Sequence, residues 1–208
     1  MISANFLFIV IASTCLIVSN EFLKRKFILP VYLTRKLAHF GGSFIAFLSP
    51  YFITQQEIIL ISLIFVVTLF FTRQTTLFSS IHAVKRDTLG EVFLPAGVAA
   101  SALFFLPDHA LAFQFGILIM GISDGLAGLI GEGLGKHKIK ILGGGKTVEG
   151  SCVFFLTSLT LTTLFASGLG HKALLAAFIL TAVEFFLEYG LDNLALPVLA
   201  GYLLIILT

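Results

Sequence analysis

Charged residues are scarce in this sequence, and tryptophan is absent from it. Only 12% of the 208 residues are Asp, Glu, Lys or Arg, whereas 58% are hydrophobic. A soluble domain carries about 25% charged residues, because its surface must be solvated. The low charge therefore excludes an ordinary water-soluble domain and predicts a protein that has lipid as its solvent.

Cysteine is also rare, because only Cys15 and Cys152 occur and both lie within apolar runs. Their spacing fits neither a metal site nor a disulfide framework, so we interpret them as small hydrophobic side chains. The formal net charge is only +2 and gives no indication of a nucleic-acid partner. Phenylalanine is abundant instead, with 23 residues, which is more bulk than a small soluble core could hide.

Long hydrophobic runs dominate the chain. A helix needs about 20 residues to cross a bilayer, and eight runs approach that length: 3–20, 37–54, 57–72, 91–107, 109–131, 150–168, 172–189 and 192–207. We expect an all-α fold, a polytopic integral membrane helix bundle of seven or eight transmembrane helices. Without a linker or a repeat to divide it, residues 1–208 are expected to form a single domain.

Lysine and arginine are concentrated in three of the connections between these runs. With eight spans and the N-terminus outside, all three connections face the cytoplasm, in agreement with the positive-inside rule. We therefore expect a multi-pass membrane protein, in the cell membrane if it is prokaryotic. Basic loops alone can also be topology signals or lipid-headgroup contacts. Every Lys and Arg except Lys172 falls in these loops: Lys24, Arg25, Lys26, Arg35, Lys36, Arg73, Lys85, Arg86, Lys136, Lys138, Lys140 and Lys146.

Asp124 lies within the fifth apolar run, where a carboxylate is costly. Insertion scales give a penalty of about 2.5–3.5 kcal/mol at a helix centre, so Asp124 must face protein, water or a cation. Gly121, Gly128, Gly131 and Gly135 recur at steps of three or four and share a helical face with it. Such a face lets a backbone or a ligand approach closely. The alternative is a packing seam of small residues in which Asp124 caps a neighbour.

The loop from Gly133 to Ser151 is rich in glycine and lysine. Glycines allow backbone N–H groups to form a concavity for anions, and lysines add positive charge. Thr147 and Ser151 add hydroxyls at a predicted helix start, where the helix dipole favours phosphate. It is not a P-loop, because Lys140 stands where that motif needs glycine and no strand is predicted before it. A flexible basic loop, or a simple helix start, remains the alternative.

Arg35, Lys36 and His39 begin the second apolar run at helical spacing, so they converge on one face. They would meet an anion at the membrane surface, or they are ordinary basic residues flanking a span. Glu184 and Glu188 lie one turn apart on the same side of the membrane, where they would bind a cation or pair with basic loop residues.

Acidic residues, a glycine–lysine loop and a basic cluster all map to one membrane face. Metal-assisted chemistry on polyphosphates needs this mixture, with acids for Mg²⁺ and with lysines and amides for phosphates. Topology alone would not require the acids.

These segments, in this order over about residues 35–200, resemble the dolichol, phytol and diacylglycerol kinase family of CTP-dependent lipid kinases. Ser123 stands where many members have glycine, but a small residue is kept. The similar segments are Arg35-Lys36-Leu37-Ala38-His39, Ser123 to Gly131, Gly135-Lys136, Lys146 to Ser151, and Glu188 to Asn193 followed by Pro197.

The resemblance implies a transmembrane catalytic domain that transfers the γ-phosphoryl group of CTP to a membrane lipid alcohol, with Mg²⁺ as cofactor. Asp124 would bind the metal–nucleotide, and either Asp192 or Glu184 would be the base or a second metal ligand. The implied catalytic residues are Asp124, Lys146, Arg35, Lys36 and Asp192. The implied nucleotide- and phosphate-binding residues are Gly131, Lys136, Gly144, Gly145, Thr147, Glu149, Gly150 and Ser151. Residues assigned to the lipid or to support are His39, Glu184 and Asn193.

Two other functions are weighed against the lipid kinase, and the oligomeric state is left open. A CTP:phosphatidate cytidylyltransferase also pairs an aspartate with a later Lys-Thr-x-Glu-Gly, but its expected C-terminal signature is absent and the Arg35-Lys36 and His39 cluster favours the kinase. A small transporter or membrane scaffold would instead use Asp124 to line a pathway.

Overall fold

The computed structural model describes residues 3–75, 77–82, 88–139, 145–166 and 170–208. Its first helices are α1 (Ala4–Phe27), α2 (Val31–Leu48), the 3-10 turn η1 (Ser49–Tyr51), α3 (Gln55–Thr72), α4 (Ser79–His82) and α5 (Gly90–Phe105). They are followed by α6 (Ala110–Leu118), the π-helical turn η2 (Ile119–Asp124), α7 (Gly125–Gly133), α8 (Val148–Phe165), α9 (His171–Phe186) and α10 (Asp192–Leu207). The helical fold is as predicted, apart from a short antiparallel pair of strands, β1 (Lys138–Ile139) and β2 (Lys146–Thr147).

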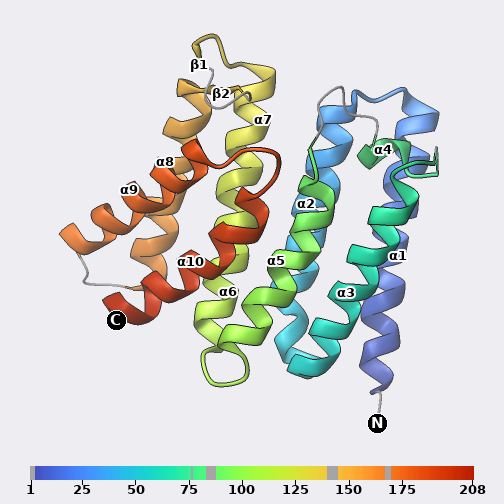
Figure 1. Ribbon diagram of the computed structural model, residues 1–208, viewed down its shortest axis with the longest axis horizontal. Coiled ribbons are helices and arrows are strands. Elements are labelled where there is room, and N and C mark those ends of the chain that lie inside the picture. Colours follow the sequence, from blue (N-terminus) through green and yellow to red (C-terminus); the bar gives the residue numbers. More distant parts are fainter. Residues whose placement is uncertain (1–2, 76, 83–87, 140–144, 167–169) are drawn as a thin grey trace.

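The helices form two halves (Figure 1). One half holds α1, α2, α3 and α5, and the other holds the continuous α6–η2–α7 rod with α8, α9 and α10. Within the first half, α1 packs along α2 and α3 packs along α5, but few contacts join one pair to the other. Helix α10 packs on both α5 and α6, and α2 packs on η2 and α7, so these contacts join the two halves.

The predicted count of seven or eight transmembrane helices is not confirmed. Among the described residues, four helices are long and apolar enough to cross a membrane: Ala4–Phe27, Gln55–Thr72, Ala110–Gly133 and Val148–Phe165. Two further apolar helices, Gly90–Phe105 and Asp192–Leu207, are shorter. Large apolar side chains cover the outer surface, as with Phe71 at 72% exposure and Leu164 at 71%. A soluble monomer rarely exposes so much apolar surface, whereas lipid solvates it.

Local sequence signals explain where several helices begin. Thr54 and Glu57 form a capping box at the start of α3, which satisfies backbone N–H groups that lack a helical partner. The Thr147 side chain accepts a hydrogen bond from the Gly150 N–H and caps α8 in the same way. Thus the simple alternative for Thr147 to Gly150, a helix start, is correct.

Two predicted boundaries were wrong because hydropathy stops at polar residues while the helix continues. Helix α1 runs past residue 20 to Phe27, and Glu21 on it accepts hydrogen bonds from the Ser80 N–H at 2.7 Å and the Ser79 hydroxyl at 2.8 Å. Helix α2 begins at Val31 rather than at 37. Arg35, Lys36 and His39 therefore lie inside this helix, and they point sideways into the protein instead of outward from its end.

The three basic connections lie at one end of the bundle. In Figure 1 the α1–α2 connection, the α3–α5 region with α4, and the β1–β2 strands are all at the top, while the N-terminus and the α2–α3 connection are at the bottom. This arrangement agrees with the predicted gathering of the charged loops on one side. Which side is cytoplasmic stays a prediction.

Candidate functional site

A cavity of about 940 Å³ runs between the helices and changes character along its length. One end is lined by charged side chains from α2, η2, β2, α9 and α10. The other end, which we call the apolar arm, is lined mainly by apolar residues of α1, α2, α3 and α5. The charged residues at the first end are Arg35, Lys36, His39, Asp124, Lys146, Glu184 and Asp192.

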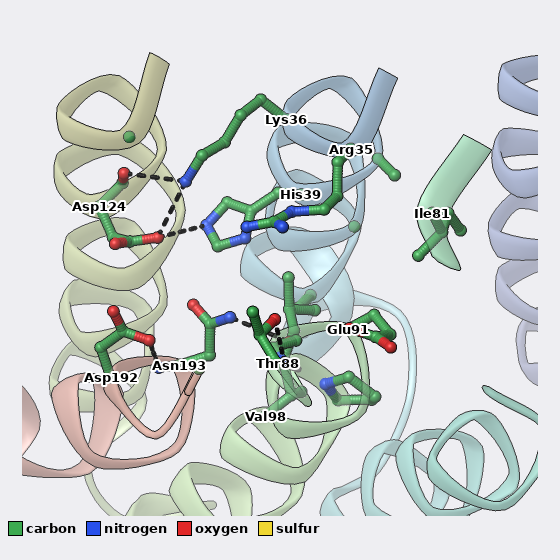
Figure 2. A pocket seen from close by; sticks show the side chains of 18 of the residues that line it. Arg35, Lys36, His39, Ile81, Thr88, Glu91, Val98, Asp124, Asp192 and Asn193 are labelled. Carbon is green, nitrogen blue, oxygen red and sulfur yellow. Dashed lines mark hydrogen bonds and ion pairs between the residues drawn. The ribbon is translucent and has the colours of Figure 1, made fainter. Parts of the chain in front are cut away.

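Asp124 ends the π-helical turn η2 and is buried against α2. Lys36 Nζ lies 3.3 Å from Asp124 Oδ2 and 3.2 Å from the Asp124 carbonyl oxygen. His39 Nε2 lies 3.6 Å from the same carboxylate oxygen and 2.8 Å from the Met120 carbonyl, which can only accept a hydrogen bond. Nε2 therefore carries a proton. Figure 2 shows Lys36 and His39 reaching across to Asp124, with Arg35 extending beside His39.

The predicted glycine face packs against two neighbours. A Cβ atom on Gly121 would lie 2.5 Å from Ser43 Cβ, and one on Gly128 would overlap the end of the Lys36 side chain. Gly131 and Gly135 instead approach Thr147. The packing-seam alternative is thus correct for these glycines, and the seam also seats Lys36 beside Asp124. π-helical turns are frequent at functional sites, and this one lies in the seam.

Lys146 is the centre of a second charged cluster. Its Nζ lies 2.5 Å from Glu184 Oε1 and 3.1 Å from Asp192 Oδ2. Burial would lower the pKa of Lys146, but the carboxylates of Asp192 and Glu184 raise it above its ordinary value, so the amine stays charged. The alternative of Glu184 pairing with a loop lysine is correct. Ser151 joins the cluster, because its hydroxyl donates to Glu184 Oε2 at 3.4 Å.

The connection between α9 and α10 enters the site and packs against the start of α5. Gly190 adopts a φ of 89°, and a Cβ on it would overlap the backbone of Gly90, so only glycine fits there. Asn193 Nδ2 donates to the Gly90 carbonyl at 2.9 Å, and its N–H donates to Asp192 Oδ1 at 3.0 Å. Asn193 thus fastens α10 to α5. Leu191 is the N-cap residue of α10, so Asp192, its first residue, does not cap the helix from that position.

Most predicted site residues line the cavity, but some of the predicted loop residues line it and others do not. Gly131, Gly145, Thr147, Gly150 and Ser151 line it. The Thr147 hydroxyl is engaged in its helix cap, however, and the Ser151 hydroxyl in the bond to Glu184. The Thr147 hydroxyl accepts in its cap and can still donate its own hydrogen, and the predicted phosphate-binding role of Thr147 and Ser151 stays a prediction.

Lys136 and Glu149 are not among the residues that line the cavity. Glu149 Oε1 accepts hydrogen bonds from the backbone N–H groups of Lys136 and His137 at 3.1 and 3.2 Å, and lies 2.7 Å from His137 Nδ1. Glu149 therefore orders the loop between α7 and β1. Gly144 lies outside the described residues, so its predicted role stays a prediction.

Arg35 lines the charged end of the cavity. Among the described residues, no hydrogen bond or ion pair of its side chain occurs. Its predicted role in meeting a phosphate stays a prediction.

Glu91, which was not included in the predicted site, also lines the cavity. Its Oε1 lies 3.4 Å from His82 Nδ1 and 3.6 Å from Arg73 Nε, so it ties α5 to α4 and to the residue after α3. A glutamate at the start of an apolar helix was the available signal. His82, the partner of Glu91, was not predicted as a site residue either, because neither residue belongs to a recognisable motif.

A second cavity, of about 140 Å³, lies between α1 and α3. Ile17, Ile61 and Phe65 line both cavities. On its outer side, Val18 is 55% exposed and Ile64 is 47% exposed, so this small cavity lies between the apolar arm and the outer surface of the bundle.

The carboxylates at the charged end have the chemistry of Mg²⁺ ligands. Within the described segments, no group of three or more His, Cys, Asp or Glu side chains is arranged to hold a metal ion by itself. Asp124 and Asp192 nevertheless face one cavity. Mg²⁺ usually takes one or two carboxylates and fills its other positions with water and substrate phosphates. The residues therefore fit a metal that arrives with a polyphosphate, and Asp124 as its ligand stays a prediction.

Similarity to known proteins extends over most of the chain. It is 27% identical over 191 residues to a phytol kinase of Synechocystis sp., a match that covers 87% of this chain and 82% of that protein. No protein-family model matches the sequence, and no solved structure matches it.

Two uncharacterised proteins are also similar, over shorter stretches. One, from Methanocaldococcus jannaschii, is 34% identical over 122 residues, covering 58% of this chain and 60% of that protein. The other, from Rickettsia prowazekii, is 32% identical over 135 residues, covering 59% of this chain and 63% of that protein.

Proposed function

We propose that this protein is a CTP-dependent lipid kinase, which transfers the γ-phosphoryl group to the hydroxyl of a membrane lipid alcohol. One observation carries the proposal: the charged cluster and the apolar arm belong to a single cavity. A polyphosphate needs the first environment and a lipid tail needs the second. The similarity to a protein named phytol kinase supports a prenol such as phytol as acceptor, with polyprenols and diacylglycerol as further candidates.

The cationic side chains are the groups that would hold the phosphates. Lys36, Lys146 and Arg35 line the charged end, and cation–phosphate hydrogen bonds are among the stronger ones in proteins. Phosphate oxygens would compete with Asp124 for Lys36, and with Glu184 and Asp192 for Lys146. Nucleotide binding would therefore exchange ion pairs within the protein for ion pairs with the ligand.

Asp124, with either Asp192 or Glu184 as a second ligand, would hold Mg²⁺, which when bound neutralises charge on the phosphates. The other carboxylate of that pair is then free to accept a proton. The remaining chemistry is positioning. The lipid oxygen attacks the γ-phosphorus, the bond from that phosphorus to the β,γ-bridging oxygen breaks, and the nucleoside diphosphate leaves. The hydroxyl proton passes to a carboxylate, for which Asp192 and Glu184 are the candidates. Lys36, Lys146 and Arg35 would stabilise the charge that develops on the transferred group.

Labelled nucleotides test this proposal. Purified protein with Mg²⁺ is incubated with CTP, ATP or GTP carrying label on the γ-phosphate, over phytol, other prenols and diacylglycerol. We expect label to move from the γ-phosphate of CTP into lipid, with release of CDP and with loss of transfer in Asp124→Ala. The basic end of the bundle is proposed to face the cytoplasm, which CTP supplied to sealed vesicles of either orientation would check.

The same assay addresses the competing functions. Label from the α-phosphate of CTP in lipid, appearing only when phosphatidate is added and with release of pyrophosphate, would mean a cytidylyltransferase. No transfer with any alcohol or with phosphatidate would overturn both enzymatic proposals and favour a transporter or scaffold.

A further inference from the structure

The apolar arm has a regular construction. On each of its four helices the lining residues recur at steps of three or four, so each helix contributes one stripe. On α2 the stripe passes from His39 through Gly42 and Ala46 to Ser49. Adjacent residues such as Ile45 and Ala46, or Ile61 and Ser62, both line the cavity. Each helix thus presents a mostly apolar face, which suits a hydrocarbon chain.

The arm lies in the gap between two helix pairs. Helices α1 and α2 pack along each other, as do α3 and α5, while few contacts connect the pairs. Helix α2 rises about 20 Å from Lys36 to Ser49, and its stripe lines the cavity along that length. The charged end and the end around Ser49, which we call the far end, are thus separated by a fixed distance along α2.

The far end is lined by small residues at or just after the end of α2 and by larger apolar ones. Ala46 and Ser49 are buried and line the cavity, together with Ile53 and Ile58. The Ser49 hydroxyl donates to the Ala46 carbonyl at 2.7 Å, so its polarity is satisfied by the helix itself. Any group larger than these at position 46 would shorten the arm from its far end.

Gly42 lies at the change from the charged end to the apolar arm. A Cβ there would meet only Leu94 Cδ2, at 3.8 Å, an ordinary van der Waals contact. Alanine therefore fits without any movement, whereas a large side chain would occupy the cavity between the two ends. Gly42 keeps the passage between them open.

We propose that the apolar arm binds the hydrocarbon chain of the acceptor alcohol and that Ala46, near the end of the arm far from Lys36, sets the chain length that fits. This inference rests on the proposed lipid kinase function for the hydroxyl headgroup and, through the similarity to a phytol kinase, for an acceptor with one chain. The occupant to which it commits is one prenyl chain, with its hydroxyl at Lys36 and Asp124 and its tail toward Ile53 and Ile58.

The test uses geraniol, farnesol, geranylgeraniol, phytol and diacylglycerol with the full chain in nanodiscs. Binding without nucleotide is measured by competition with a photoreactive farnesol, and transfer is measured separately. Every value for a variant is expressed as the ratio of variant to wild type for the same alcohol, so that differences in membrane partitioning cancel. Wild-type affinities for different alcohols are compared as mole fractions in the nanodisc. We expect wild-type protein to bind phytol and geranylgeraniol at least about tenfold more tightly than diacylglycerol.

Ala46→Phe is expected to bind geraniol and farnesol like wild type but to lose at least about tenfold in affinity for geranylgeraniol and phytol. Ile58→Ala changes the same end in the opposite direction and should improve the relative binding of the longest prenols. It keeps the proposal testable if Ala46→Phe fails to fold. Gly42→Phe should block every prenol. Leu37→Phe, at an exposed position of α2 that does not line the cavity, is its control with near wild-type binding.

The outcomes separate the two proposals. Equal loss for all alcohols in Ala46→Phe, no loss at all, or diacylglycerol binding as tight as prenol binding would overturn the chain-length inference. Prenol binding that follows the expected pattern, without phosphoryl transfer from any nucleotide, would overturn the kinase proposal and leave the binding site standing.

Discussion

Two clusters of opposite composition face the same cavity. Around Asp124 one acid lies between two bases, Lys36 and His39; around Lys146 one base lies between two acids, Glu184 and Asp192. If the charge of Asp124 is removed, a neutral His39 leaves Lys36 as the one cation of this cluster. If Lys146 is removed, two buried carboxylates remain close together without a cation. The Lys146 cluster is therefore the more important for the fold, and the Asp124 cluster is the more adjustable.

The largest effect is expected from Lys146→Met, because it leaves Glu184 and Asp192 uncompensated. Breaking a buried ion pair from one side costs about 3–5 kcal/mol, so both folding stability and phosphoryl transfer should fall. Thermal unfolding in detergent, followed by circular dichroism because the chain has no tryptophan, measures the change. Lys172→Met, at an exposed position, is the control. Equal melting temperatures for the two variants would contradict the importance of the Lys146 cluster for the fold.

Asp124→Asn should come next, with transfer reduced about a hundredfold or more but a smaller loss of stability than Lys146→Met. The amide oxygen can still accept from Lys36, which also keeps the Asp124 carbonyl as a partner. Rates with CTP and a prenol are compared with melting temperatures. The control is Ser123→Ala, at the residue before Asp124. The buried hydroxyl of Ser123 has no hydrogen-bond partner among the described residues. Destabilisation as large as in Lys146→Met would show that the two clusters are equivalent.

Gly128→Ala tests whether the position of Lys36 matters beyond its charge. The added methyl group would overlap the end of the Lys36 side chain, so Lys36 should leave Asp124 without changing the charge of the site. A hydrogen bond to a charged group contributes about 1.5–3 kcal/mol, and we expect the KM for nucleotide to rise about tenfold. Gly133→Ala is the matched control, because no atom lies within 4 Å of its added Cβ. Identical KM values would refute the role of the glycine seam.

The smallest effect is expected from Glu149→Gln, which belongs to neither cluster. Its carboxylate holds the backbone of Lys136 and His137 at the surface, and exposed interactions of this kind contribute little to stability. The KM for nucleotide should rise by less than about fivefold, with little change in melting temperature. An increase as large as in Gly128→Ala would mean that Glu149 contacts the nucleotide directly.

The sequence predicted the charged end of the cavity better than the rest of it. Asp124 within an apolar run, and Arg35, Lys36 and His39 at helical spacing, are local signals with a physical cost, so their convergence could be anticipated. Their pairing could not, because it depends on α2 beginning at Val31 and packing against η2. Hydropathy places a span after the last charge, whereas a helix continues wherever its backbone hydrogen bonds can form.

The apolar arm left no trace in the sequence. Its lining residues, such as Ile45, Ile61 and Leu94, have the same composition and period as residues that fill a core or face lipid. Only the incomplete packing between α2 and the α3–α5 pair distinguishes them, and that is a property of the folded helices together.

The small cavity between α1 and α3 has a kinetic consequence. If a lipid alcohol reaches the apolar arm there, past Ile17, Ile61 and Phe65, it diffuses in the plane of the bilayer and never crosses water. The concentration that governs the rate is then the mole fraction of alcohol among the surrounding lipids. Diluting the alcohol with inert phospholipid should slow turnover, while diluting the vesicles at constant composition should not.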